Sequence, residues 1–245
     1  MANKIEIRNL TKSFSGKMVL NGLDLDIEEK KSLVILGKSG GGKSVLIKNM
    51  SMLMTPDSGS IKMDDQEITH LGETKRFKLM DKFGFLFQNG ALFDSMKVWE
   101  NIAFKLILNK KIREREAKKI AIDKLEIVDL DEKIADLYPH ELSGGMQKRV
   151  ALARAIACNP EVIFFDEPTT GLDPVTSNKI NNLIVKTIEI TKATAITITH
   201  DINSARMISD KMVLLADGKI CWEGNRDTMY DANSVPIKKF LGGIE

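Results

Sequence analysis

Alternating apolar and charged residues open the chain and predict β-strands. Residues 5–7 and 23–27 alternate strictly, and side chains two positions apart lie on the same face of a strand. The run 33–36 is apolar throughout, which is typical of a strand buried on both faces. Residues 60–68 carry a polar two-residue turn between short strand patterns and predict a hairpin.

The spacing of apolar residues changes to three and four between residues 98 and 157, which predicts helices interrupted at Pro139. Apolar runs at 161–165 and 193–198 predict further buried strands. From Lys211 onward the pattern indicates two strands joined by a tight turn, then short helices. Because strands and helices alternate at both ends, the pattern favours an α/β fold with a parallel sheet.

This organisation predicts one domain over residues 1–245. Residues 1–86 and 159–245 would form its α/β core, and residues 87–158 would form an inserted helical subdomain. Length permits this interpretation, since a chain of this size buries roughly 70% of its unfolded surface.

Composition narrows the class of protein. Hydrophobic residues make up 43% and charged residues 29% of the 245 residues, which excludes a disordered chain and a disulfide scaffold. The net charge is 36 − 34 = +2, so a nucleic-acid partner is not expected. No apolar run approaches the ~20 residues that cross a bilayer, and the N-terminus lacks a signal-peptide pattern. Cys158 and Cys221 form no metal or redox spacing, so we expect a cytoplasmic protein.

A glycine-rich motif after the apolar strand 33–36 carries the clearest chemistry. It fits G-x-x-x-x-G-K-[ST] and precedes a predicted helix, the context that a phosphate-binding loop requires. Its backbone N–H groups would bind phosphate oxygens, Lys43 the β- and γ-phosphates of ATP, and Ser44 a Mg²⁺ ion. The motif consists of Gly37, Lys38, Ser39, Gly40, Gly41, Gly42, Lys43 and Ser44.

Two acidic residues follow the apolar strand 162–165. Strand alternation predicts that Asp166 and Glu167 point in opposite directions at the carboxyl edge of the sheet, where ligands bind in such folds. Asp166 would hold Mg²⁺, and Glu167 would polarise the water that attacks the γ-phosphate. An acidic pair that only begins a surface loop before Pro168 is the alternative.

A second anion-binding turn is predicted at Ser143, Gly144 and Gly145, which precede another helix. One chain would thus carry two half-sites for phosphate. Two copies facing head to tail would complete each site, giving a homodimer with two ATP molecules in its interface. The alternative is an ordinary helix cap.

Four further residues fit this geometry. His200 ends a buried strand and would contact the γ-phosphate, whereas a purely structural histidine is the alternative. Gln88 follows a strand and would reach the metal or the water, and Asp173 would face the partner subunit. Phe14 would stack on adenine unless it is a core residue.

These motifs, in this order, resemble those of the ATP-binding-cassette ATPases over nearly the whole chain. They are the aromatic residue Phe14, the Walker A loop 37–44, the Q-loop Gln88, the signature LSGGM at 142–146, the Walker B strand with Glu167, Asp173 of the D-loop, and His200. The resemblance implies a P-loop NTPase with a RecA-like parallel sheet, an antiparallel β subdomain and an inserted α-helical subdomain. It also implies ATP hydrolysis with Mg²⁺, held by Ser44, Gln88 and Asp166. Lys38 stands where many members have proline, and we expect its side chain to face solvent.

The segment after Gln88, FQNGALFDSM-x-VWENIAF, looks like that of the Mla-type ATPases, which work with MCE-domain proteins in lipid transport. Leu92, Phe93 and Met96 would form an apolar docking surface for a permease, unless they pack inside the helical subdomain.

The resemblance thus implies a motor subunit that moves phospholipids between the inner and outer membranes. Its partners would be a membrane permease, an MCE-domain substrate-binding protein and, by analogy, a small regulatory subunit. It would lie peripherally at the cytoplasmic side of the inner membrane. A transporter motor for another substrate, such as an amino acid or a drug, and an ATP-gated dimerisation scaffold are the alternatives.

Overall fold

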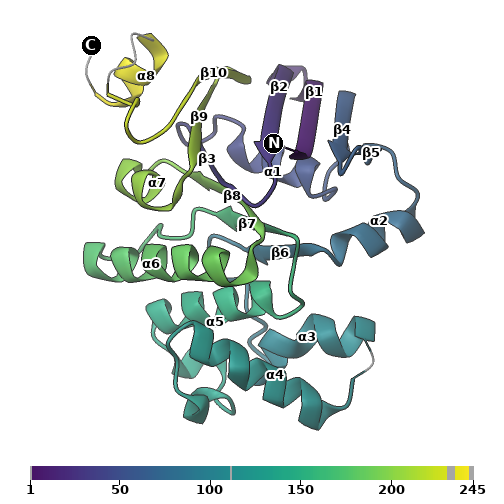
Figure 1. Cartoon of the computed structure of the whole chain (residues 1–245), viewed down its shortest axis with the longest axis vertical. Coiled ribbons are helices and arrows are strands. Elements are labelled where there is room, and N and C mark those ends of the chain that lie inside the picture. Colours follow the sequence, from purple (N-terminus) through teal and green to yellow (C-terminus); the bar gives the residue numbers. More distant parts are fainter. Residues whose placement is uncertain (1, 111, 231–234, 243–245) are drawn as a thin grey trace. The chain divides into compact units, whose positions relative to one another are not determined.

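Two units make up the chain in the structure, a computed structural model that describes residues 2–110, 112–230 and 235–242. The first unit combines Met1–Met80 with Thr194–Glu245, and the second is Asp81–Ala193. Figure 1 labels the elements of both. None of the helices in the described ranges is long and apolar enough to cross a membrane.

An antiparallel sheet in the first unit has the strand order β2-β1-β4-β5. Its strands are β1 (Asn3–Phe14), β2 (Lys17–Glu28), β4 (Ser58–Met63) and β5 (Gln66–Glu67). Ile7 of β1 lies opposite Leu25 on one side and Ile61 on the other, and all three side chains are buried. The alternation predicted from sequence therefore places one apolar face in the core.

Parallel strands form the other sheet of this unit. β3 (Ser32–Leu36) pairs in parallel with β8 (Thr194–Thr199) and β9 (Lys211–Ala216), while β10 (Lys219–Gly224) is antiparallel to β9. Every residue of β3 is buried, as expected for a strand covered on both faces. The helices of this unit are α1 (Lys43–Met50), α2 (Glu73–Met80), α7 (Ile202–Ile208) and α8 (Val235–Phe240).

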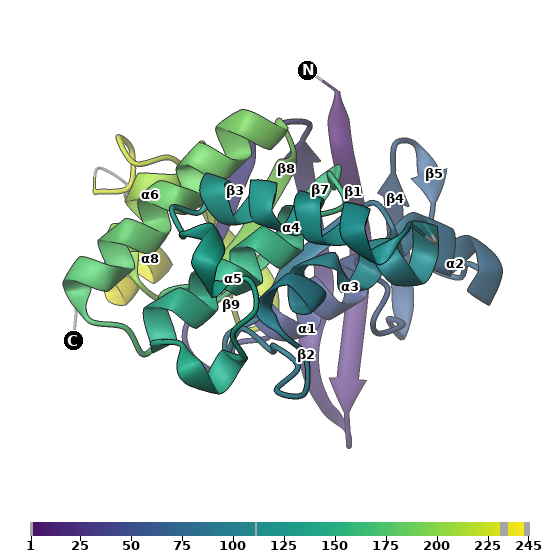
Figure 2. The same ribbon diagram turned by 90° about the horizontal axis from the view of Figure 1, so that it is seen from below.

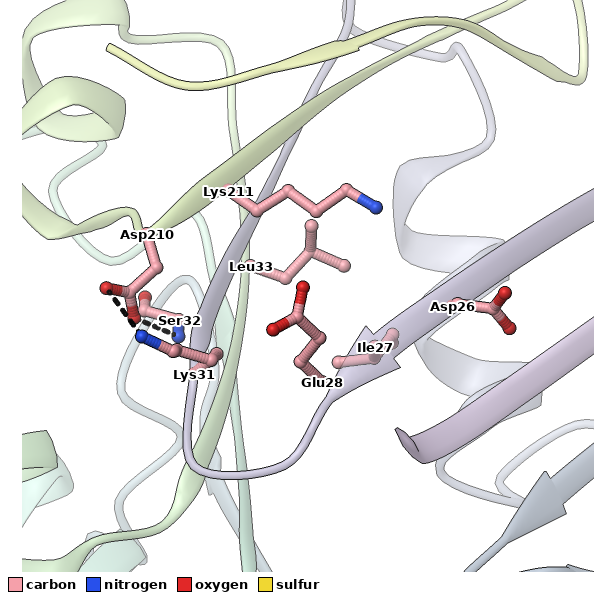
Figure 3. Close-up of a pocket in the computed structure, with 8 residues that line it drawn as sticks. All are labelled: Asp26, Ile27, Glu28, Lys31, Ser32, Leu33, Asp210 and Lys211. Carbon is pink, nitrogen blue, oxygen red and sulfur yellow. Dashed lines mark hydrogen bonds and ion pairs between the residues drawn. The ribbon is translucent and has the colours of Figure 1, made fainter. Parts of the chain in front are cut away.

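Asp210 interacts with residues at the amino end of β3, next to the start of β9. Its carboxylate accepts the backbone N–H of Ser32 at 2.8 Å and lies 3.9 Å from the ammonium of Lys31 (Figure 3). A pocket of about 200 Å³ opens beside these residues.

The carboxyl ends of β3 and β8 lie at the opposite edge of the sheet, where Leu36 pairs with Thr199. Gly37 and His200 therefore leave the sheet side by side.

The second unit pairs β6 (Phe83–Leu86) in parallel with β7 (Val162–Asp166). Its helices are α3 (Val98–Lys110), α4 (Glu114–Ile127), α5 (Gly144–Ile156) and α6 (Pro174–Thr191), with short 3-10 helices at Glu132–Ile134 and Pro139–Glu141. α5 packs against α3, α4 and α6 (Figure 2). A Cβ atom on Gly84 of β6 would lie 2.3 Å from the carbonyl oxygen of Ala155, so α5 approaches β6 this closely only because residue 84 is glycine.

The strands, the parallel pairing and the helical region predicted from sequence are confirmed. The helical region is divided into three α-helices, and the second 3-10 helix begins at the predicted interruption, Pro139. No helix was predicted from sequence at the positions of α2, α6 and α7. The signal for α6 was present, since Asp173 and Pro174 are a typical N-cap and first helical residue.

Candidate functional site

The glycine-rich motif forms a tight turn between β3 and α1. A Cβ atom on Gly37 would lie 2.6 Å from the carbonyl oxygen of Leu215, so only glycine fits there. Gly40 and Gly42 have φ angles of 74° and 96°, which favour glycine. Gly42 is the N-cap of α1 and has no side chain to cap the first N–H groups of the helix. These donors and the positive end of the helix dipole are therefore available to an anion.

Lys43 lies folded back over this turn. It is 5% exposed, and its Nζ donates to the carbonyl oxygens of Gly37 at 2.8 Å and Lys38 at 3.1 Å. The ammonium is thus positioned at the loop, next to the N-terminus of α1. Ser44 is exposed in the first turn of α1, and Lys38 is exposed as expected.

The acidic pair sits where β7 ends. Asp166 is the last residue of the strand, and Glu167 is only 8% exposed with a φ of 49°. Such a left-handed conformation at a residue other than glycine costs on the order of 1–3 kcal/mol and is typical of functional sites. Because the strand ends at Asp166, the loop and not strand alternation sets the direction of Glu167. Thr170 Oγ1 donates a hydrogen bond of 2.8 Å to its carboxylate.

The signature turn begins α5 within the second unit. Ser143 is the N-cap, and its Oγ accepts a long hydrogen bond of 3.3 Å from the Met146 N–H. Ser143, Gly144 and Gly145 line a pocket of about 740 Å³ together with Asp173. The structure therefore brings the predicted signature turn and the predicted D-loop residue to one pocket.

Asp173 also caps the N-terminus of α6. This structural role was not predicted from the sequence. Its Oδ1 accepts the backbone N–H groups of Val175 and Thr176, each at 3.0 Å. Hydrogen bonding by Thr176, and then by Val175, lowers the pKa of Asp173 below its usual value. The carboxylate therefore stays charged next to the pocket.

Two cations of α5 hold the segment that contains Gln88, and sequence reasoning did not single them out. Lys148, which is 7% exposed, donates to the carbonyl oxygen of Gln88, and Arg154 donates to those of Gly90 at 2.5 Å and Ala91 at 2.7 Å. Burial lowers the pKa of Lys148, and the negative charge of Asp166 opposes that shift. Helix α5 thus links the signature turn to the Gln88 segment.

Replacing Lys148 with Met is expected to lower ATP turnover about tenfold, because the carbonyl group of Gln88 loses its donor from α5. ATP affinity should change less than twofold, since the phosphate loop is untouched. Steady-state hydrolysis and nucleotide titration measure the two effects separately. Lys119→Met, at an exposed position of α4, is the matched control. Equal turnover in both variants would contradict the link.

The residues after Gln88 are ordered by Asn101, which is fully buried. Asn101 Oδ1 accepts the Phe93 N–H at 2.7 Å, and its Nδ2 donates to the carbonyl oxygens of Phe93, Met96 and Lys97. Phe93 nevertheless keeps 42% of its surface exposed, although its ring contacts Phe104. Leu92 and Met96 are half-buried, so these side chains are not enclosed within the helical region.

Asn101→Leu is expected to destabilise the protein by about 3 kcal/mol, because the Phe93 N–H loses its acceptor and three carbonyl groups each lose one donor. Thermal unfolding should show a fall of roughly 10 °C for a chain of this size. Asn89→Leu, an exposed position in the same segment, should change stability by less than about 0.5 kcal/mol. A similar loss in the two variants would contradict this role for Asn101.

Phe14 and His200 are both accessible. Phe14 is 43% exposed at the end of β1, with the Lys12 ammonium 5.6 Å from the centre of its ring, so it is not a core residue. His200 is exposed directly after β8, and Asp201 beside it caps α7. Phe14 and His200 thus lie on the surface of the first unit.

Comparison with known proteins places these features in a family. The family model described as "ABC transporter" matches residues 20–170. A probable ribonucleotide transport ATP-binding protein, mkl, of Mycobacterium leprae is 38% identical over 99% of this chain and 70% of its own. The intermembrane phospholipid transport system ATP-binding protein MlaF of Haemophilus influenzae is 36% identical over 98% of this chain and 91% of its own.

Other relatives, each 36% identical, are named as import proteins for methionine and for sulfate or thiosulfate. Among solved structures, the dimeric ATP-binding cassette MJ0796 in a post-hydrolysis state with ADP and Pi is 33% identical. It superposes with a TM-score of 0.82 over 90% of this chain and 98% of its own. The P-loop NTPase fold and the family resemblance predicted from sequence are therefore confirmed. The chain belongs to the ABC transporter family and is an ATPase of the ATP-binding-cassette type.

Proposed function

We propose that this ATPase is the motor subunit of a multi-subunit transporter that moves phospholipids between the inner and outer membranes. The match to the phospholipid-transport protein MlaF carries the proposal, because it extends over 98% of this chain and 91% of that protein. The exposed Phe93 and its neighbours after Gln88 would contact a membrane permease. That permease would hold the chain at the cytoplasmic side of the inner membrane, in a complex with an MCE-domain protein.

ATP would bind with its phosphates on the N–H groups of residues 37–44 and on the Lys43 ammonium, and with its adenine on Phe14. The oxygen donors Ser44, Gln88 and Asp166 suit Mg²⁺, which prefers hard ligands and would neutralise phosphate charge. Ser44 is accessible in the first turn of α1, and Asp166 ends β7, which fits this assignment.

Hydrolysis would use Glu167 as the general base. A water oxygen forms a bond to the γ-phosphorus, the bond to the bridging oxygen of ADP breaks, and a water proton passes to the Glu167 carboxylate. His200 would contact the γ-phosphate. The strained backbone of Glu167 and its hydrogen bond from Thr170 support this role, because both fix the carboxylate before the substrate arrives.

The pocket of about 740 Å³ at the signature turn would receive the ATP of a second copy of the chain. Its lining by the N-terminus of α5 and by Asp173 supports a head-to-tail homodimer, in which each ATP contacts the phosphate loop of one subunit and Ser143 of the other.

Mixed dimers test this arrangement. Ser143→Arg should block the pocket, and Lys43→Ala should disable the phosphate loop, so we expect each variant alone to lose more than about 90% of its ATPase activity. A mixed dimer of the two variants contains one site in which both halves are intact, and should recover turnover at that site. Differential tags allow the mixed species to be purified. Mixed dimers as inactive as the parents would contradict the head-to-tail arrangement.

Affinity purification from native membranes in mild detergent tests the substrate. Mass spectrometry of the proteins and bound lipids should find a multi-span permease, an MCE-domain protein and phospholipid. A complex with a periplasmic solute-binding protein and a polar solute would instead favour an importer like the methionine and sulfate relatives. That outcome would overturn lipid transport and leave the ATPase assignment intact.

A further inference from the structure

The parallel sheet of the first unit fixes the backbone just before His200. Thr199, the last residue of β8, is buried and pairs with Leu36, the last residue of β3. Gly37, the next residue after Leu36, begins the phosphate loop. The pairing therefore sets where His200 leaves the sheet relative to that loop, whereas contacts further along the chain set the direction that the backbone takes.

Asp201 holds the backbone on the other side of His200. Its N–H donates to Thr199 Oγ1 at 3.0 Å, so a hydrogen bond joins the two neighbours of the histidine. Its carboxylate caps α7, because Oδ1 accepts the Asn203 N–H at 3.0 Å and Oδ2 accepts the Ser204 N–H at 3.3 Å. One residue thus connects the end of β8 to the start of α7 by its backbone and by its side chain.

Ser204 adds a contact that helix capping does not require. Capping uses backbone N–H donors. The Ser204 residue is completely buried, and its Oγ also donates to Asp201 Oδ2 at 2.5 Å. Hydrogen bonds to a carboxylate are stronger than those between neutral groups. Both oxygens of Asp201 are therefore held, and with them the orientation of the whole carboxylate.

Helix α7 is attached to the same sheet as His200. Ala205 and Ile208 of α7 are buried, and the helix packs against β3 and β8 (Figure 1). Both ends of the short turn that contains His200 are thus anchored to one sheet. The Cα–Cβ direction of His200 is therefore set before a nucleotide binds.

We infer that Asp201 is a positioning residue for His200 in ATP hydrolysis, and that it acts together with Thr199 and Ser204. This inference rests on the proposed contact between His200 and the γ-phosphate. The Asp201 carboxylate does not touch the nucleotide in this role; it holds the turn so that the imidazole is aligned with the γ-phosphate in advance. Alignment matters because a displacement of about 1 Å can cost about 100-fold in rate.

Steady-state ATP hydrolysis by the full chain tests the inference. Asp201→Ala is expected to lower kcat about tenfold and to leave the KM for ATP within about twofold, because the phosphate loop is unchanged. Loss of the helix cap should also lower the melting temperature by about 2–4 °C. The assay is run well below the melting temperature, so that the folded fraction is the same in all variants.

Asp131→Ala is the matched control for the loss of a cap. Asp131 is the N-cap of the 3-10 helix Glu132–Ile134, and its Oδ1 accepts the Lys133 N–H at 2.8 Å. The control should lower the melting temperature by no more than about 4 °C and leave kcat within about twofold. A loss of kcat confined to Asp201→Ala would thus follow the position of the cap and not its effect on stability.

A double-mutant cycle separates positioning from a merely structural role. His200→Ala should lower kcat at least about 100-fold, as expected for a group that stabilises the transition state. In that background, Asp201→Ala should change kcat less than about twofold, because no imidazole remains to be positioned. A structural role would lower kcat by the same factor in both backgrounds.

Two further variants address the individual contacts. Asp201→Asn provides a second measurement if Asp201→Ala does not fold. Asparagine caps helices as well as aspartate does, and its amide still pairs with the Ser204 hydroxyl, so kcat should stay within about threefold of the parent. Ser204→Ala keeps the two capping N–H bonds and removes the hydroxyl, and should lower kcat about threefold with an unchanged KM.

The outcomes distinguish this inference from the role of His200 itself. Equal kcat in Asp201→Ala and Asp131→Ala, or an equal loss with and without the imidazole, would overturn the positioning role and leave the proposed contact of His200 intact. Parental kcat in His200→Ala would overturn both, because the imidazole would then make no contact that hydrolysis needs.

Discussion

Glu167→Gln is expected to reduce ATP turnover by about 10²–10⁴-fold and to leave ATP affinity within about twofold. Removing a general base costs this much, because the attacking water no longer has an acceptor for its proton. ATP affinity is retained because glutamine has the same size and Glu167 does not belong to the phosphate loop. The position of the side chain is also retained, since the buried backbone and the Thr170 hydroxyl fix it and glutamine still offers an oxygen to that hydroxyl.

Slow hydrolysis should also trap the dimer. With ATP and Mg²⁺, Glu167→Gln should elute as a dimer in size-exclusion chromatography, whereas the parent returns to monomer as ATP is consumed. Thr170→Val is the matched variant, because it removes the hydrogen bond but keeps the base, and we expect a loss of about tenfold only. A Glu167→Gln protein that stays monomeric with ATP, with and without its permease, would refute the shared ATP interface.

Local patterns predicted the parts of the fold that depend on neighbouring residues. The apolar run of β3 and the glycine motif after it specify a buried strand, a tight turn and a helix, and the structure has the strand at Ser32–Leu36 and the helix at Lys43–Met50. The same holds for β7 and the acids that follow it. Such motifs can be predicted from sequence because strand burial, turn geometry and helix capping each depend on residues that are close together in the chain.

Local sequence patterns did not predict the contacts between residues that are far apart in the chain. Lys148 and Arg154 donate to carbonyl groups about 60 residues earlier in the chain, and nothing in their own helix indicates that partner. The left-handed backbone of Glu167 was also missed, because the sequence does not state where β7 ends.

Lys43→Ala is expected to weaken ATP binding by about 100-fold and to abolish measurable turnover. The Lys43 ammonium would form charge-assisted hydrogen bonds to the β- and γ-phosphates, each contributing roughly 1.5–3 kcal/mol. Part of that gain is offset, because in this structure the same Nζ already donates to the Gly37 and Lys38 carbonyl oxygens. A net loss near 2.7 kcal/mol corresponds to about two orders of magnitude in affinity.

The same contacts predict a stability effect without nucleotide. Alanine leaves the Gly37 and Lys38 carbonyl groups without the Lys43 donor, so Lys43→Ala should lower the free energy of unfolding by about 1–2 kcal/mol. Nucleotide titration and denaturant unfolding measure the two effects on one preparation. Lys38→Ala is the matched control in the same loop: its exposed side chain should affect neither quantity, because only its backbone carbonyl meets Lys43. Equal losses of ATP affinity in both variants would mean that binding depends on the net charge of the loop and not on the ammonium at position 43, which would contradict its assignment to the phosphates.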